Sequence, residues 1–126
     1  MISFTIPGTL PTMNEIVAAS KKNHMAYANM KKDYTALVMI SAQGLPKVSK
    51  ADFIITWYCE NKRKDPDNIA GGGIKMILDG LVKAGVIPND GWSEINSITH
   101  HFEVDKQNPR IEIKIFELIY DLDVPN

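Results

Sequence analysis

Residues 51–59 read Ala-Asp-Phe-Ile-Ile-Thr-Trp-Tyr-Cys, and no other segment of the chain predicts a β-strand as clearly. They are rich in β-branched and aromatic side chains, which fit the pleated surface of a sheet. The segment runs directly into the charged sequence Lys62-Arg63-Lys64-Asp65-Pro66-Asp67-Asn68. Because active sites are common at strand ends and in the loops after them, we expect this charged segment to lie at such a place.

A long helical region is predicted before this strand, over residues 13–43. Thr12 can cap its first turn, with Glu15 at the position that completes a capping box. Apolar residues recur at spacings of three and four in the second part of the region, which indicates a face packed against a core. An interruption is expected near Asn23-His24.

A shorter helix is predicted after the strand. Apolar residues at positions 74, 77, 78 and 81 have the spacing of an amphipathic helix that ends near Ala84-Gly85. The three glycines at 71–73 are expected to form a loop before it, because each glycine costs a helix about 1 kcal/mol relative to alanine.

The remaining elements complete the predicted fold. Strands are also predicted at residues 2–7, 95–104 and 110–118. Residues 105–109, Asp-Lys-Gln-Asn-Pro, have the composition of a hairpin turn. The order strand, helices, strand, helix, strand, strand predicts a single α+β domain over residues 1–126, with a mixed β-sheet and helices packed against it. Residues 120–126 are expected to be a frayed tail.

The composition is that of an ordinary globular protein, with 44% hydrophobic and 23% charged residues in 126, enough to bury a core. The first residues read as a strand and not as a signal peptide, and no stretch reaches the roughly 18 apolar residues of a membrane span. The single cysteine, Cys59, excludes an internal disulfide and fits a reducing, cytoplasmic location.

The net charge of −1 does not by itself indicate a protein that binds nucleic acid. Basic residues are nevertheless clustered in the first third of the chain, at Lys21, Lys22, His24, Lys31 and Lys32. These side chains either form a solvated helix face or contact DNA phosphates. A second basic group, Lys62, Arg63 and Lys64, lies against acidic residues.

Three carboxylates are the candidate chemical site: Asp65, Asp67 and Asp90. In an extended segment Asp65 and Asp67 would face the same side, and Pro66 favours that conformation for Asp65. Oxygen ligands suit Mg²⁺, with Mn²⁺ as a possible substitute, and nearby cations suit a phosphate substrate. The alternative is that Asp67 caps the helix after it and Asp65 is a turn residue, with no chemistry. The ligand spacings of an EF-hand, a zinc site and a Walker loop are absent from the sequence.

Three segments together carry a resemblance: Arg63-Lys64-Asp65-Pro66-Asp67-Asn68-Ile69, Ile77-Leu78-Asp79-Gly80-Leu81 and Ala84-Gly85-Val86-Ile87-Pro88-Asn89-Asp90. They resemble the RusA family of Holliday junction endodeoxyribonucleases. That family shows an acid-x-acid-Asn opening, a helix containing Asp-x-Leu, and a close of the form Gly-x-hydrophobic-x-Asn/Asp-Asp. The resemblance implies a RusA-like fold in which Asp65, Asp67 and Asp90 are the essential metal-binding acids.

The family also uses a lysine shortly after the first two acids, near the scissile phosphate. The glycine run 71–73 stands there in this chain, and Lys75 is the nearest candidate. A helix starting at Asn68 would place Lys75 about 12 Å along its axis from Asp67, whereas the glycine loop would let it reach the acids. Alternatives for the phosphate role are Lys62, Arg63 and Lys64, and expected DNA contacts also include Asn14, Lys31 and Lys32.

The resemblance implies a metal-dependent endonuclease that resolves four-way DNA junctions by paired symmetric nicks during recombination and repair. It also implies a homodimer and a bacterial or prophage origin. The alternative is a junction- or fork-binding protein with weak or lost cleavage, since glycines replace the lysine. A nuclease for flaps or forks, and an interaction domain whose acids are only caps, also stay open.

Four residues near these motifs have structural expectations. Asp79 is expected to form an ion pair with Lys75 or Lys83 along the helix. Trp92 could stack on a base, but it is expected instead to pack over the loop after Asp90. His100 and its neighbour at position 101 lie in a strand and should face opposite sides.

Overall fold

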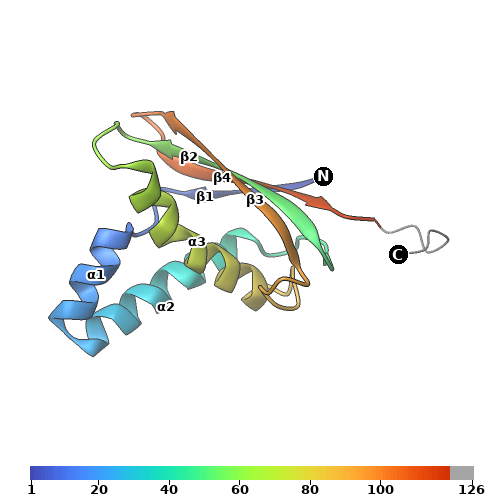
Figure 1. Cartoon of the computed structure of the whole chain (residues 1–126), viewed down its shortest axis with the longest axis horizontal. Helices are drawn as coiled ribbons and strands as arrows, with labels where there is room; N and C mark the ends of the chain where they lie inside the picture. Colours follow the sequence, from blue (N-terminus) through green and yellow to red (C-terminus); the bar gives the residue numbers. More distant parts are fainter. Residues whose placement is uncertain (120–126) are drawn as a thin grey trace.

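The computed structural model describes residues 1–119, and the tail predicted at 120–126 lies outside the described residues. The elements along the chain are β1 (Ile2–Pro7), α1 (Met13–Lys22), α2 (His24–Ser41), β2 (Ala51–Cys59), α3 (Pro66–Lys83), β3 (Ile95–Val104) and β4 (Arg110–Glu117). The three helices lie on one side of the sheet, with α1 packed against α2 and α3 (Figure 1). The predicted α+β fold, a mixed sheet with helices packed against it, is confirmed.

The sheet has the strand order β1-β4-β2-β3. β4 is antiparallel to both β1 and β2, whereas β3 is parallel to β2. The predicted hairpin between β3 and β4 is therefore wrong, because β2 lies between them. Residues 105–109 do reverse the chain, but they carry it across the end of β2, where the Asp105 amide donates to the Cys59 carbonyl at 2.8 Å. The strongly apolar β2 takes one of the two central positions, with β4 paired along one edge and β3 along the other.

The core lies between the sheet and the helices. Alternate residues of β2 face it, and Phe53, Ile55 and Trp57 are almost fully buried. The apolar side chains of β4 and of α3 pack against the same layer: Ile111, Ile113, Ile115, Ile77 and Leu81. Burial on one face only explains the period-two pattern by which β4 was predicted.

The start of α1 lies at the predicted cap, and α1 and α2 meet at the predicted interruption. The Glu15 amide donates to Thr12 Oγ1 at 3.2 Å, which confirms Thr12 as the cap of α1. The predicted interruption falls at Asn23, whose backbone is extended and whose side chain accepts a hydrogen bond from the Ala26 amide at 2.7 Å. One asparagine thus ends the first helix and caps the second.

The predicted glycine loop is wrong, because residues 71–73 lie inside α3, which begins at Pro66. A Cβ at Gly72 would clash with the Pro11 carbonyl and lie 2.5 Å from the Met13 nitrogen, and one at Gly73 would lie 2.6 Å from the Trp57 ring. The two glycines let α3 approach the start of α1 and the sheet closely. This packing outweighs the intrinsic cost of glycine in a helix.

Among residues 1–119, none of the helices combines the length and the apolar character needed to cross a membrane.

Candidate functional site

The first two candidate acids lie at the start of α3. Asp65 is its N-cap, with the extended backbone that Pro66 was expected to impose (φ −72°, ψ 148°), and its side chain makes no capping hydrogen bond. Asp67 lies in the first turn, so the alternative in which Asp67 is the cap is wrong in position. Both carboxylates are exposed. The helix dipole stabilises a carboxylate in the first turn. The side chain of Asp65 makes no capping hydrogen bond, so its oxygens are available to a ligand.

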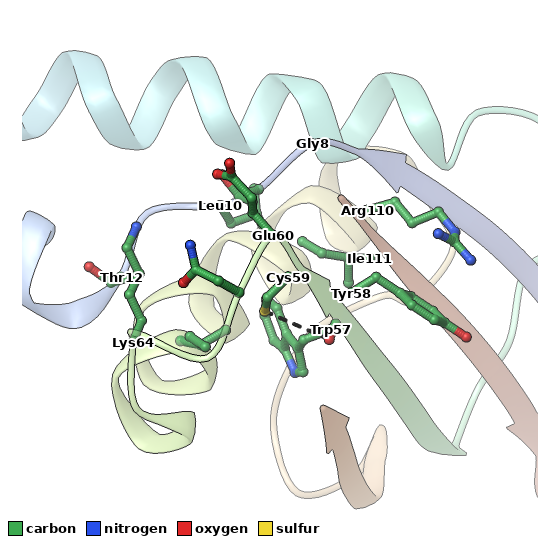
Figure 2. Close-up of a pocket in the computed structure, with 13 residues that line it drawn as sticks. Gly8, Leu10, Thr12, Trp57, Tyr58, Cys59, Glu60, Lys64, Arg110 and Ile111 are labelled. Atoms are coloured by element: carbon green, nitrogen blue, oxygen red, sulfur yellow. Dashed lines mark hydrogen bonds between the residues drawn. The ribbon is translucent and has the colours of Figure 1, made fainter. Parts of the chain in front are cut away.

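Two contacts join the start of α1 to the start of α3. The Asn14 amide donates to Asn68 Oδ1 at 2.9 Å, and Lys64 Nζ lies 3.2 Å from Glu15 Oε1. The partial burial of Glu15 would raise its pKa, but the hydrogen bonds from Lys64 and Thr12 bring it below its ordinary value. This contact uses the backbone of Asn14, so its exposed side chain stays a predicted DNA contact, while Lys64, expected to face phosphate, is engaged with Glu15. Lys64 and Thr12 also line the pocket in Figure 2.

Asn68 was not among the predicted site residues. Its side chain holds the first turn of α3 against α1 and so fixes the segment that carries Asp65 and Asp67. The signal was present in the sequence as the residue that completes the acid-x-acid-Asn motif.

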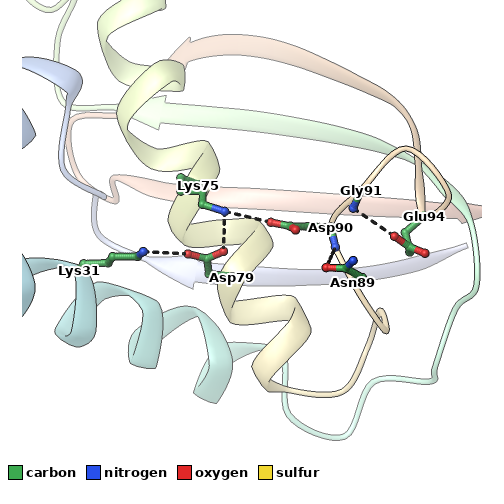
Figure 3. A network of polar contacts seen from close by, with 7 residues as sticks. All are labelled: Lys31, Lys75, Asp79, Asn89, Asp90, Gly91 and Glu94. Carbon is green, nitrogen blue, oxygen red and sulfur yellow. Dashed lines mark hydrogen bonds and ion pairs between the residues drawn. The ribbon is translucent and has the colours of Figure 1, made fainter.

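The third acid belongs to a separate network in the middle of α3. Lys75 Nζ lies 3.2 Å from Asp90 Oδ2 and 3.0 Å from Asp79 Oδ1, and Lys31 Nζ from α2 lies 3.7 Å from Asp79 Oδ2 (Figure 3). Hydrogen bonds from Asp79 and then Asp90 raise the pKa of Lys75. The predicted pair of Asp79 with Lys75 is confirmed, whereas its second cation is Lys31 and not Lys83.

The two groups lie along one row of α3. Asp67, Gly71, Lys75 and Asp79 succeed one another at i, i+4 spacing, which places them on neighbouring turns of the same side. A Cβ at Gly71 would meet only Met13 Cε, at 3.6 Å, so the surface between the groups is open. Lys75 lies about 12 Å along the helix from Asp67, too far for it to contact the first two acids as the predicted loop would have allowed.

No three or more Asp, Glu, His or Cys side chains within residues 1–119 are gathered closely enough to form a metal site. The acids thus lie as an exposed pair at the helix start and a third acid bound to Lys75. The assignment of all three to one metal site remains a prediction.

The other basic candidates lie around these acids. Lys62 and Arg63 are exposed in the loop before α3, where the Arg63 amide donates to Asn61 Oδ1 at 2.9 Å. Lys62 also lines a groove of about 520 Å³ between this loop and the end of β3, together with Asp65. Lys31 and Lys32 line another hollow, between α2 and α3, that also includes Asp90.

The predictions for the aromatic neighbours have mixed outcomes. Trp92 is 96% exposed, so the expectation that it packs over the loop is wrong. The turn is held without it, because the Gly91 amide donates to Glu94 Oε1 at 3.1 Å and the Gly91 carbonyl accepts from Ile95. His100 faces the helices and accepts a hydrogen bond from Trp57 Nε1 at 2.9 Å.

The chain was also compared with known proteins. No model of a known protein family matches it, and no curated protein matches it either.

Proposed function

We propose that this protein is a divalent-metal-dependent endonuclease that hydrolyses phosphodiesters in branched DNA. The observation that carries the proposal is the row Asp67, Gly71, Lys75 on α3, with Asp90 bound to Lys75. Exposed acids and a lysine share one side of the helix, and the glycine between them leaves room for a phosphate. The motifs that resemble the RusA family fall on these same residues.

The donor set fits a hard cation. Asp65 and Asp67 offer exposed carboxylate oxygens, and Asp90 lies on the same side of α3. These three residues would hold Mg²⁺ or Mn²⁺, which when bound would activate a water molecule and offset the charge of the scissile phosphate. Because the carboxylates are not gathered in advance, we expect metal binding to draw them together. Lys75 orients Asp90 and adds a positive charge beside the phosphate.

The surroundings suit a DNA backbone. Lys62 and Arg63 precede the acids, and Lys32 lines the hollow between α2 and α3 that also includes Asp90. Contacts of this kind recognise phosphates and shape more than base sequence. We propose a four-way junction as the substrate and a homodimer as the active form, since two sites related by a two-fold axis match two opposed strands. A cytoplasmic location in a bacterium or a prophage-encoded origin belongs to the same proposal.

A second candidate is a junction- or fork-binding protein with weak or lost cleavage. The observation that favours it is Gly71, which stands near where the resembling family carries a lysine, while Lys75 is engaged with two carboxylates. Gly71→Lys separates the two functions, since a Cβ fits at this position without a clash. Cleavage by the wild type favours the nuclease, and cleavage by Gly71→Lys alone favours the binding protein.

The test is cleavage of a labelled four-way junction with Mg²⁺, Mn²⁺ or EDTA, with a forked duplex in parallel. Wild-type protein is expected to make paired symmetric nicks that require metal and that disappear in Asp67→Asn. Asp33→Asn, an exposed acid on α2, is the matched control and should cleave normally. Metal-independent binding without nicks would support the binding protein. Failure to bind any branched DNA would refute both candidates.

A further inference from the structure

A pocket lies at the end of the sheet beside the candidate acids (Figure 2). Its walls come from the loop between β1 and α1, the end of β2, the start of β4 and the loop that leads into α3. We call it the strand-end pocket, and the residues that matter are Leu10, Trp57, Asn61, Lys64, Ile69 and Arg110. The strand-end pocket shares Asn61, Lys64 and Ile69 with the neighbouring groove that Asp65 lines, so it lies close to the first of the acids.

The size and lining of the strand-end pocket suit a small ring. Leu10, Trp57 and Ile69 give it apolar surfaces, and its cavity volume is about 160 Å³. An apolar cavity of about 150 Å³ is enough to hold benzene, a ring the size of a pyrimidine. On one side the Arg110 guanidinium lies 3.9 Å from the centre of the Tyr58 ring, a cation–π contact that stabilises the position of both side chains in this wall.

The charges around the pocket favour an uncharged ligand. Lys64 is paired with Glu15, and Arg110 is paired with Asp105 at 2.7 Å and with Glu112 at 3.1 Å. Because both cations already have carboxylate partners, an anion such as phosphate would have to displace them. A neutral ring that hydrogen-bonds at its edge needs no such exchange. The Asn61 side chain, whose Oδ1 accepts from Arg63, keeps its NH₂ group as a donor for that edge.

We propose that the strand-end pocket binds one unstacked nucleobase of the DNA, next to the phosphate that is cut. The proposal rests on the proposed function, because it assumes that DNA lies over Asp65 and Asp67. A base that has lost its pairing at a branch point is the cheapest to extrude from the stack, so the pocket favours branched over continuous duplex DNA. Placing that base also fixes which phosphate meets the acids.

The experiment combines a pocket variant with removal of single bases. Thr9→Trp places a large ring at the pocket wall from an exposed position, and Thr5→Trp, on the outer face of β1, is the matched control. Binding of a four-way junction is measured by fluorescence anisotropy in Ca²⁺, which shares the oxygen preference of Mg²⁺. Thermal unfolding of each variant verifies that it is folded.

An abasic site at one position near the nick is expected to weaken wild-type binding about tenfold, the loss typical of one stacked base. Thr9→Trp should weaken binding by the same factor and show no further loss with the abasic junction, whereas Thr5→Trp should behave as wild type. Asn61→Ala removes only the hydrogen-bond donor. We therefore expect the abasic site to weaken binding by this variant less than it weakens binding by the wild type.

Three results would overturn the inference. Equal binding by Thr9→Trp and Thr5→Trp would show that the pocket is not used. Independent, additive losses from Thr9→Trp and the abasic site would place the base elsewhere, and cleavage by the wild type would then leave the proposed function intact. A change of oligomeric state in Thr9→Trp, with no base dependence, would assign the pocket to a second copy of the chain. Absence of any junction binding would remove both proposals.

Discussion

Gly72→Ala is expected to destabilise the protein, although alanine is the better helix former. The new Cβ would clash with the Pro11 carbonyl and lie 2.5 Å from the Met13 nitrogen. These are backbone atoms at the capped start of α1, so they cannot rotate aside as a flexible side chain would. Overpacking of this kind costs about 1–3 kcal/mol, and backbone contacts place it near the upper end. The higher helix propensity of alanine offsets about 1 kcal/mol of this cost, so the free energy of unfolding should fall by about 2 kcal/mol.

Gly71→Ala is the matched control, one position earlier in the same helix. Its Cβ would meet only Met13 Cε, at 3.6 Å, an ordinary contact. The expected change is therefore a gain of about 0.5–1 kcal/mol from helix propensity alone. The two adjacent substitutions should differ by about 3 kcal/mol in the free energy of unfolding.

Urea unfolding monitored by circular dichroism measures this difference directly. For a domain of this size about 1 kcal/mol corresponds to roughly 4 °C in Tm, so the two variants should melt about 12 °C apart. If Gly72→Ala were as stable as Gly71→Ala, the close approach of α3 to the start of α1 would be refuted. The explanation of the glycine run inside the helix would fall with it.

Three further predictions concern other contacts. Asp79→Asn removes the nearer of the two carboxylates that contact Lys75, so NMR titration should show the pKa of Lys75 falling towards 10.5. The free energy of unfolding should decrease by only about 0.3–0.5 kcal/mol. An unchanged pKa of Lys75 would contradict the ion pair. Burial lowers the pKa of His100, so as the pH falls the unfolded state binds a proton at this residue before the folded state does. The free energy of unfolding should therefore be highest above pH 6.5 and should decrease as the pH drops through the folded pKa. His100→Gln should make the free energy of unfolding less dependent on pH in this range, as measured by urea unfolding at several pH values. Trp92→Ala should change the free energy of unfolding by less than about 0.5 kcal/mol, because the ring is exposed. Trp57→Ala, in the core, should lower it by about 3–5 kcal/mol. A large loss from Trp92→Ala in the same urea assay would mean that its ring packs against the protein.

Local signals in the sequence predicted most of the elements correctly. The β-branched and aromatic composition of residues 51–59, the cap residue Thr12 and the interruption near Asn23 act within a few positions, so their effect can be read without the fold. Strand order is different, because the turn at 105–109 constrains only the direction of the chain. Which strand β4 pairs with depends on the burial of β2, and that is decided by the whole core.

In the candidate site, too, the local contacts could be predicted from the sequence and the long-range contact could not. Pro66 fixed the conformation of Asp65, and i, i+4 spacing predicted the contact of Lys75 with Asp79. The contact of Lys75 with Asp90 joins residues 15 positions apart and depends on how the loop after α3 returns. Spacing along the chain carries no information about such a return.

The three glycines inside α3 differ in how much space surrounds them. Helix propensity, which is the same for each glycine, could not predict this difference. Gly72 and Gly73 are required by close packing, but Gly71 is not, since its Cβ has room. The fold therefore does not explain the absence of a side chain at position 71. That position lies between Asp67 and Lys75 on the row that carries the acids. A longer side chain there would cover the surface over which we propose that the phosphate lies. We therefore propose that glycine at 71 keeps this surface accessible, whereas close packing requires glycine at 72 and 73.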